Sequence, residues 1–229
     1  MTIGDRLDDI CDRIDRAARR FGHQRSDIDL IAVSKYVDRP AIEEALAYGI
    51  QDFGENQVQE IVRKKAWFAP ARLHMIGQLQ SNKVRKLPHD LALIQSIDRP
   101  SLVRELEKVG AREGVIFHGL IQVNNAGEAQ KGGISPHDLP ALLDLIEGME
   151  HLQIEGLMNI APFFEQAEEV RPYFRDMRKL FEKIKNLGYN RINMKHLSMG
   201  MTHDYELALE EGANMVRIGR AIFGERASK

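Results

Sequence analysis

The chain has 229 residues, of which 43% are hydrophobic and 29% are charged, and its formal net charge is −2 at pH 7. This composition fits a folded chain with a sizeable core, and the small negative charge argues against a nucleic-acid-binding face. Cys11 is the only cysteine, which excludes an internal disulfide and a cysteine-rich metal site. No apolar segment approaches the ~20 residues of a membrane span, and the charged N-terminus is unlike a signal peptide, so we expect a cytoplasmic protein.

The chain begins with an amphipathic helix and then alternates strand-like and helix-like segments. Residues 2–21 carry apolar side chains at helical spacing, and Gly22 follows them. Eight short runs of strand type come next. We expect these strands at 30–34, 50–54, 73–77, 91–96, 116–123 and 152–158, in a seventh run that ends at Ser198, and at 215–219.

Helices are predicted between most of these strands. Pro40 and Pro100 each begin one, because proline is well tolerated in the first helical turn. Others are expected over residues 58–67 and 83–86, and in segments that end at 188 and before 212.

The alternation predicts the fold class. No hairpin-type turn joins two strands, which favours parallel strands with right-handed crossovers, and eight strands close a barrel. An open, doubly wound sheet is the alternative, but it normally carries a glycine-rich fingerprint after its first strand, and residues 34–37 are not one. We therefore predict an α/β protein, a single (β/α)8 TIM barrel over residues 1–229 with an extra N-terminal helix.

Lys35 stands at the end of the first predicted strand. Partial burial at the rim of a parallel sheet makes a lysine amine available as a nucleophile towards an aldehyde, which suggests a Schiff base. The alternative is a rim lysine that marks only where the strand meets water.

The last two strands carry the features of a phosphate site. In a β/α barrel, phosphate commonly binds at the loops after strands 7 and 8. The first loop reads Ser198-Met199-Gly200-Met201-Thr202, with two hydroxyls and a glycine, and Gly219 ends strand 8. An ordinary turn and a glycine bend are the alternative for either piece alone.

Arg217 is expected to point into the barrel from strand 8, next to strand 1. A buried guanidinium keeps its charge and needs a partner, which is either a core carboxylate or a ligand atom that accepts a hydrogen bond. A small molecule with a phosphate, an aldehyde and a ring acceptor is pyridoxal 5′-phosphate (PLP).

Several segments together resemble the pyridoxal phosphate homeostasis protein family along nearly the whole chain. They are AVSKYVD, FGENQVQE, HMIGQLQSNKVRKL, LMNIAP and LSMGMTHDYELALEEGANMVRIGRAIFG. The resemblance implies a monomeric barrel similar to the N-terminal domain of alanine racemase, with PLP held as an aldimine on Lys35. It also implies that Arg217 faces the pyridine nitrogen. By the same resemblance, Ser198, Gly200 and Thr202 with Gly219 hold the phosphate, and Asn56 and Met158 flank the ring. On these grounds cofactor binding is expected at Lys35, Asn56, Met158, Ser198, Met199, Gly200, Thr202, Arg217 and Gly219, with no catalytic residue and no metal ligand.

The resemblance implies a carrier that buffers the free cofactor and hands it on. PLP and PLP-dependent acceptor enzymes are therefore the expected partners. A guanidinium only donates hydrogen bonds, and it leaves the ring nitrogen unprotonated and the ring a weak electron sink, which favours a role without catalysis. The alternatives are a racemase-like PLP enzyme of low activity and a barrel aldolase that forms a Schiff base with a sugar phosphate. Lys131 is a hypothetical second amine near the mouth, against the alternative of a solvated loop lysine.

Overall fold

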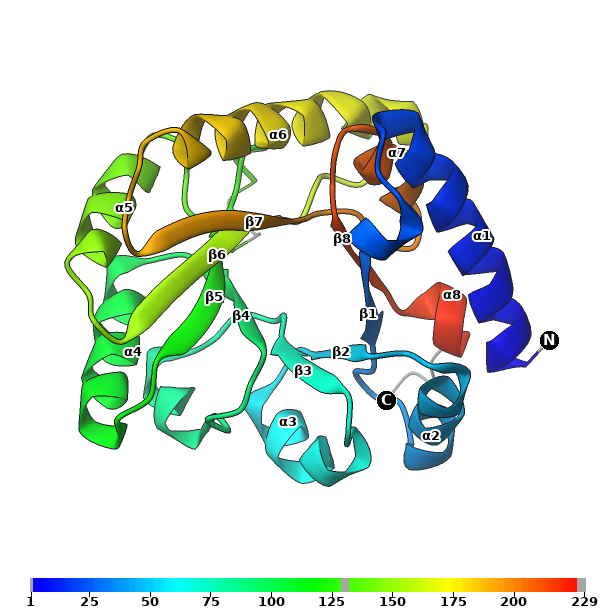
Figure 1. Cartoon of the computed structure of the whole chain (residues 1–229), viewed down its shortest axis with the longest axis horizontal. Coiled ribbons are helices and arrows are strands. Elements are labelled where there is room, and N and C mark those ends of the chain that lie inside the picture. The colour runs from blue at the N-terminus through cyan, green and yellow to red at the C-terminus, as the bar shows by residue number, and fades with distance from the viewer. Residues whose placement is uncertain (1, 129–131, 226–229) are drawn as a thin grey trace.

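The computed structural model describes residues 2–128 and 132–225, and within them it is a closed barrel of eight parallel strands ringed by helices (Figure 1). The strands follow one another around the barrel in chain order, and β1 pairs with both β2 and β8. This confirms the predicted (β/α)8 barrel. The strands are β1 (Asp29–Val33), β2 (Asp52–Glu55), β3 (Arg72–Met75), β4 (Leu93–Ile97), β5 (Phe117–Val123), β6 (Leu152–Asn159), β7 (Ile192–Ser198) and β8 (Met215–Ile218).

Helices fill most of the connections and form the outer layer of the barrel (Figure 1). The α-helices are α1 (Ile3–Phe21), α2 (Arg39–Tyr48), α3 (Val58–Lys64), α4 (Pro100–Glu113), α5 (Leu139–Glu147), α6 (Arg171–Lys185), α7 (Tyr205–Glu210) and α8 (Arg220–Phe223). Short 3₁₀ segments are η1 (Arg25–Asp27), η2 (Lys65–Trp67), η3 (Ser81–Lys86) and η4 (Ala167–Val170). The sequence patterns had indicated no helix at α5.

The crossover from β3 to β4 contains the 3₁₀ segment η3 where a short helix was expected. Leu87 follows η3 in an extended conformation and precedes Pro88, whose ring disfavours the helical region for the residue before it. The segment therefore ends after six residues.

The extra N-terminal helix α1 is fixed at both ends. Thr2 caps it: its hydroxyl accepts from the Asp5 amide (3.1 Å), and the Asp5 carboxylate accepts from the Thr2 amide (2.7 Å). Gly22 ends it with a φ of 92°, in the left-handed region that suits glycine. The buried face of α1 packs against α2, α7 and α8, so this helix covers the seam where β1 meets β8 (Figure 1).

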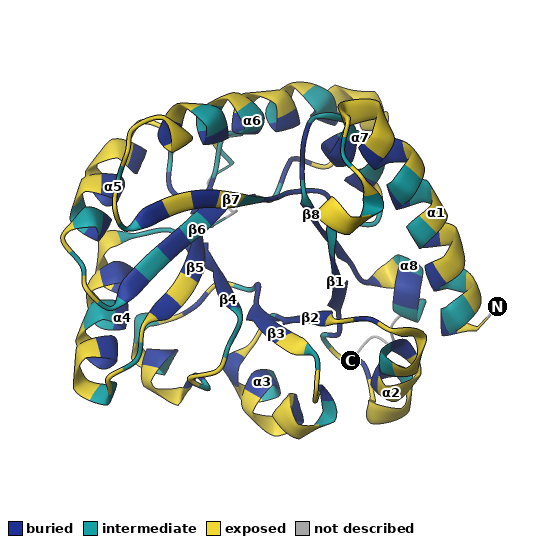
Figure 2. Cartoon of the chain, in the orientation of Figure 1, coloured by how far each residue is buried: buried dark blue, intermediate teal, exposed yellow. Residues whose placement is uncertain are grey.

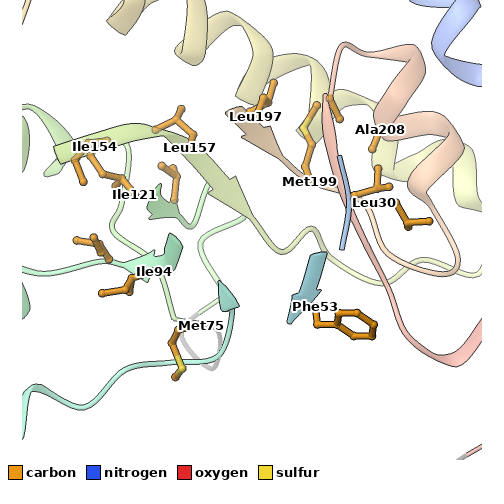
Figure 3. Close-up of a cluster of buried hydrophobic side chains, with 14 of the residues drawn as sticks. Leu30, Phe53, Met75, Ile94, Ile121, Ile154, Leu157, Leu197, Met199 and Ala208 are labelled. Carbon is orange, nitrogen blue, oxygen red and sulfur yellow. The ribbon is translucent and has the colours of Figure 1, made fainter. Parts of the chain in front are cut away.

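Two layers of apolar side chains support the barrel. The larger layer lies between the strands and the helices, where Leu30, Phe53, Ile94, Leu197 and other side chains gather (Figure 3). The helices bury their strand-facing sides and leave their outer sides exposed (Figure 2). The smaller layer fills the barrel interior and consists of Ile31, Leu93, Leu120, Met158 and Met215. Successive strand residues face opposite sides, so Leu30 and Ile31 belong to different layers.

In the part of the chain that the structure describes, no helix has both the length and the apolar character needed to cross a membrane.

Candidate functional site

A cavity of about 390 Å³ lies at the carboxyl ends of the barrel strands. This is the end at which β/α barrels carry their chemistry. Residues at or after the ends of seven of the strands line it, and those of β4 do not. Five of the residues assigned from the sequence are among them: Lys35, Asn56, Thr202, Arg217 and Gly219.

Lys35 lies in a tight turn just beyond β1, and it is half-buried. The Val37 amide donates to the Ser34 carbonyl oxygen (3.0 Å), which closes a four-residue turn with Lys35 at its second position. Tyr36 follows with a φ of 62°, a backbone conformation that residues other than glycine rarely adopt. The amine that the sequence indicated is therefore carried by a constrained turn at the cavity wall.

Arg217 is a buried cation on β8, beside Ile31 of β1. Its Nη1 donates to the Ser198 hydroxyl (2.5 Å), and its Nη2 donates to the Asn159 carbonyl oxygen (2.7 Å). Among the described residues, no carboxylate lies within ion-pair distance of this guanidinium, so the expected alternative of a core ion pair is not found there. Burial lowers the pKa of Arg217 to about 10, and the more distant charge of Asp204 opposes this shift.

At neutral pH Arg217 is therefore still charged, and its side chain lines the cavity. The hydroxyl and the carbonyl that hold it are neutral, so they accept hydrogen bonds from the guanidinium without cancelling its charge. A buried charge of this kind favours a ligand that offers a lone pair or a negative charge.

Ser198 lies beneath the cavity and does not line it. Its hydroxyl donates to Gln95 Oε1 (2.8 Å) while it accepts from Arg217. The Gln95 amide nitrogen lies 3.3 Å from His74 Nδ1, and His74 Nε2 lies 2.9 Å from Asp52 Oδ1. These contacts assign the proton of a neutral His74 to Nε2 and form a chain of polar side chains through the barrel. The Ser198 hydroxyl is therefore engaged with Arg217 and Gln95, and the phosphate contact implied by the resemblance stays a prediction.

Met158 and Met199 also have their side chains away from the cavity. Met158 packs in the barrel-interior layer, where Ile160 contacts that layer and itself lines the cavity. Met199 is completely buried in the outer layer (Figure 3). Ile160, two residues further along the chain, thus lines the cavity where Met158 does not, and the flanking role of Met158 stays a prediction.

Gly200 brings the loop after β7 against α7 and β8. Its φ is 91°, and a Cβ at this position would lie 2.7 Å from the Ala208 Cβ and 2.8 Å from the Tyr205 Cα. Its carbonyl oxygen accepts from the Arg217 amide (3.1 Å), which ties the loop after β7 to β8. Gly200 shapes the wall, while Thr202 and Gly219 lie at the cavity itself.

Other cavity residues were not assigned to the site from the sequence. They are Val33, Ile76, Gly77, Gln78, Gln122, Gly132, Ile160, Met201, His203 and Arg220. The available signal was Gly77 at the end of the third predicted strand. A Cβ on Gly77 would lie 2.2 Å from the Asn56 carbonyl oxygen, so only glycine allows the loops after β2 and β3 to meet there.

Two further expectations concern a metal and a second amine. No group of three or more His, Cys, Asp or Glu side chains that could hold a metal ion is present among residues 2–128 and 132–225. Lys131, the hypothetical second amine, lies outside the described residues.

Comparisons with known proteins agree with the geometry. The family described as "Alanine racemase, N-terminal domain" matches residues 6–227. A protein of Aquifex aeolicus (strain VF5) named pyridoxal phosphate homeostasis protein is 40% identical over 228 residues, which cover 99% of both chains. The chain belongs to the pyridoxal phosphate homeostasis protein family. A second member of this family, from Pseudomonas aeruginosa, is 38% identical over 98% of this chain and 96% of its own.

Solved structures extend the comparison. PipY of Synechococcus elongatus PCC7942, in a structure described as having PLP bound, is 33% identical, with a TM-score of 0.83 over 97% of this chain and 100% of its own. Alanine racemase from Corynebacterium glutamicum is 15% identical, with a TM-score of 0.66 over 97% of this chain and 62% of its own. At that identity it shares the barrel fold alone with this member of the homeostasis protein family.

Proposed function

We propose that this chain binds pyridoxal 5′-phosphate in the cavity, with the Lys35 amine joined to the cofactor aldehyde as an aldimine. The single observation that carries the proposal is the buried charge of Arg217 in the wall of the cavity that Lys35 also lines. A nucleophilic amine and a cation without a carboxylate partner among the described residues suit a ligand with an aldehyde and a hydrogen-bond acceptor. The PLP described in the PipY structure and the printed names of the relatives support the same ligand.

The cavity fits one molecule of this size and polarity. Small-molecule cavities range from about 300 to 1,000 Å³, and this one has about 390 Å³. We assign the ring nitrogen to Arg217 and the phosphate to the Thr202 hydroxyl and the backbone beside Gly219, which line the cavity with it. We assign Asn56 and Ile160 to the walls beside the ring.

We further propose that the chain holds and delivers the cofactor without catalytic turnover. Bound PLP supplies an electron-accepting ring, and that ring accepts electrons best when its nitrogen is protonated. Arg217 can only donate a hydrogen bond there, so it leaves the nitrogen unprotonated. Its hydrogen bonds to Ser198 and Asn159 fix the guanidinium in that role.

The fold also bears on the domain organisation of the chain. Strands from Asp29 to Ile218 build one barrel, and α1 closes its seam, so we propose that the whole chain acts as one cofactor-binding domain. We propose a cytoplasmic monomer whose partners are PLP-dependent apo-enzymes.

Borohydride reduction followed by peptide mapping tests the proposal. The purified chain is incubated with PLP and reduced, in parallel with Lys35→Ala and with Lys83→Ala as the matched control. Lys83 lies in a neighbouring depression that shares Asn56 and Gln78 with the cavity. We expect the label on Lys35 in the parent and in Lys83→Ala, and no specific label in Lys35→Ala. A label on another lysine, or none in the parent, would refute the assignment.

A second measurement separates a carrier from an enzyme. The PLP-loaded chain is incubated with L-alanine in deuterated water, and exchange at the amino-acid Cα is followed. A carrier leaves the Cα proton in place over many hours, whereas exchange with turnover would establish the racemase-like alternative.

A further inference from the structure

Lys64 is completely buried, which is rare for a lysine side chain. It is the last residue of α3, and its Nζ donates to Glu55 Oε1 (2.9 Å) and to the Ser34 carbonyl oxygen (3.0 Å). Glu60, one turn earlier on α3, lies 3.1 Å from the same Nζ. The ammonium group is thus held between α3 and the ends of β1 and β2.

Glu55 is the second charge of this cluster, and it is also completely buried. Its Oε1 accepts from Lys64 and from the Ser34 hydroxyl (2.9 Å), while its Oε2 has no hydrogen-bond partner among the residues that the structure describes. Burial raises the pKa of the Glu55 carboxyl, against the opposing effect of the Lys64 and Ser34 hydrogen bonds. We call Ser34, Glu55 and Lys64 the Ser34 clamp.

A buried ion pair is weak evidence for stability, because a well-packed apolar pair is often as stable or more so. The clamp therefore calls for a role that apolar side chains would not fill. Its position supplies one, since both polar groups of Ser34 are held immediately before Lys35.

The clamp acts on the turn that carries Lys35. The Ser34 carbonyl oxygen accepts from Lys64 and also from the Val37 amide that closes the turn. Tyr36, inside that turn, has a φ of 62°. A strained conformation of this kind persists only where the surroundings hold it.

We infer that Glu55 and Lys64 are positioning residues that fix Ser34 and so hold the Lys35 turn against the cavity wall. The inference rests on the proposed function of Lys35. Neither residue lines the cavity, so both act through the backbone of Ser34. A reacting amine that moves by about 1 Å loses up to about 100-fold in rate. We therefore expect loss of the clamp to slow imine formation at Lys35.

The test is the double variant Glu55→Leu/Lys64→Met, which removes both charges together and leaves neither unpaired. We expect it to melt close to the parent while its Lys35 reacts with PLP between about 10-fold and 100-fold more slowly, followed by absorbance and confirmed by borohydride mapping. In the cofactor-free chain we expect faster hydrogen exchange at the Val37 amide.

Glu60→Gln is the matched control. Glu60 contacts Lys64, and its replacement leaves the Ser34 contacts in place. This variant should react like the parent.

A double variant that folds, reacts at the parental rate and protects Val37 as the parent does would overturn the inference. If the double variant does not fold, Ser34→Ala decides the matter, because it removes only the hydroxyl that donates to Glu55. We expect a several-fold slower reaction and faster Val37 exchange there, and parental values would overturn the clamp. A parent chain that takes up no PLP at Lys35 contradicts the proposed function instead, and Val37 exchange then still decides whether the clamp holds the turn.

Discussion

Arg217 and Ser198 face each other across the β7–β8 pair, and the Arg217 Nη1 donates a hydrogen bond of 2.5 Å to the Ser198 hydroxyl. The same hydroxyl donates to Gln95, which in turn contacts His74. The guanidinium is therefore supported from the barrel interior by a chain of polar side chains. The Ser198 hydroxyl is thus already engaged within the fold, and the direct phosphate contact that the resemblance implied for it stays a prediction.

The substitution Arg217→Met tests the buried charge. A hydrogen bond to a charged group contributes about 1.5–3 kcal/mol, so we expect affinity for PLP to fall by roughly 10-fold to 150-fold. The measurement is an equilibrium titration followed by absorbance or fluorescence. Arg112→Met, on the exposed side of α4, is the control and should bind like the parent. Equal affinity in Arg217→Met and the parent would contradict the role given to the guanidinium.

Ser198→Ala and Thr202→Val distinguish positioning from phosphate contact. The Ser198 hydroxyl is occupied by Arg217 and Gln95, whereas Thr202 lines the cavity. We expect Ser198→Ala to weaken PLP and pyridoxal, which lacks the phosphate, by the same factor. We expect Thr202→Val to weaken PLP alone. Binding constants for both ligands are the measurement, and a loss in Ser198→Ala confined to PLP would restore the direct contact.

The fold followed from short-range patterns. Apolar runs of strand type, helices between them and closing glycines such as Gly22 and Gly49 repeat along the chain, and each end is set by local geometry. Lys35 and Arg217 could be singled out because a charge at the end of a buried strand needs an explanation. Such signals require no knowledge of what lies across the barrel.

Side-chain direction near the site depends on register, which the sequence does not display. In β6 the outward residues Ile154 and Leu157 are three positions apart, because the pairing is irregular there and Gly156 has a φ of 148°. The alternation shifts by one, and Met158 points into the barrel interior. A strict period of two would have placed Met158 on the same side as Ile154.

Lys64 shows a second reason why some features near the site could not be predicted from the sequence. It lies between Arg63 and Lys65 on a charged helix, a pattern typical of a solvated face. Its burial depends on Glu55 and the Ser34 carbonyl, which belong to other elements of the fold. Only the packing of α3 on the ends of β1 and β2 identifies it.

Gly200→Ala should destabilise the fold more than Gly188→Ala. Both glycines have positive φ values, 91° and 72°, but a Cβ on Gly200 would meet Ala208 and Tyr205, whereas a Cβ on Gly188 would meet no described residue within 4 Å. The left-handed conformation costs alanine about 1–2 kcal/mol, and overpacking adds about 1–3 kcal/mol at Gly200. Urea denaturation measures both variants. Equal losses of unfolding free energy would mean that the loop after β7 can shift to accommodate the added Cβ without destabilising the fold.

The Asp52 carboxyl links the stability of the barrel to pH. Burial acts to raise its pKa, but hydrogen bonds from His74 and Arg72 outweigh burial and hold the pKa below its usual value. The folded chain therefore binds this proton less readily than the unfolded chain, whose aspartate pKa is about 3.9. The resulting stabilisation is fully present above that value and is lost as the pH falls through the lower folded pKa.

Asp52→Asn removes this contribution. We expect the variant to lose about 1.5–3 kcal/mol of unfolding free energy at neutral pH, the range for hydrogen bonds to a charged group. As the pH falls below ~4 the difference from the parent should shrink, because the unfolded parent binds the proton first and the folded carboxyl binds it at lower pH. Urea denaturation from pH 3 to pH 7 measures both curves, with Asp176→Asn, an exposed carboxylate on α6, as the control. Parallel curves for Asp52→Asn and the parent would show that another group carries the acid sensitivity.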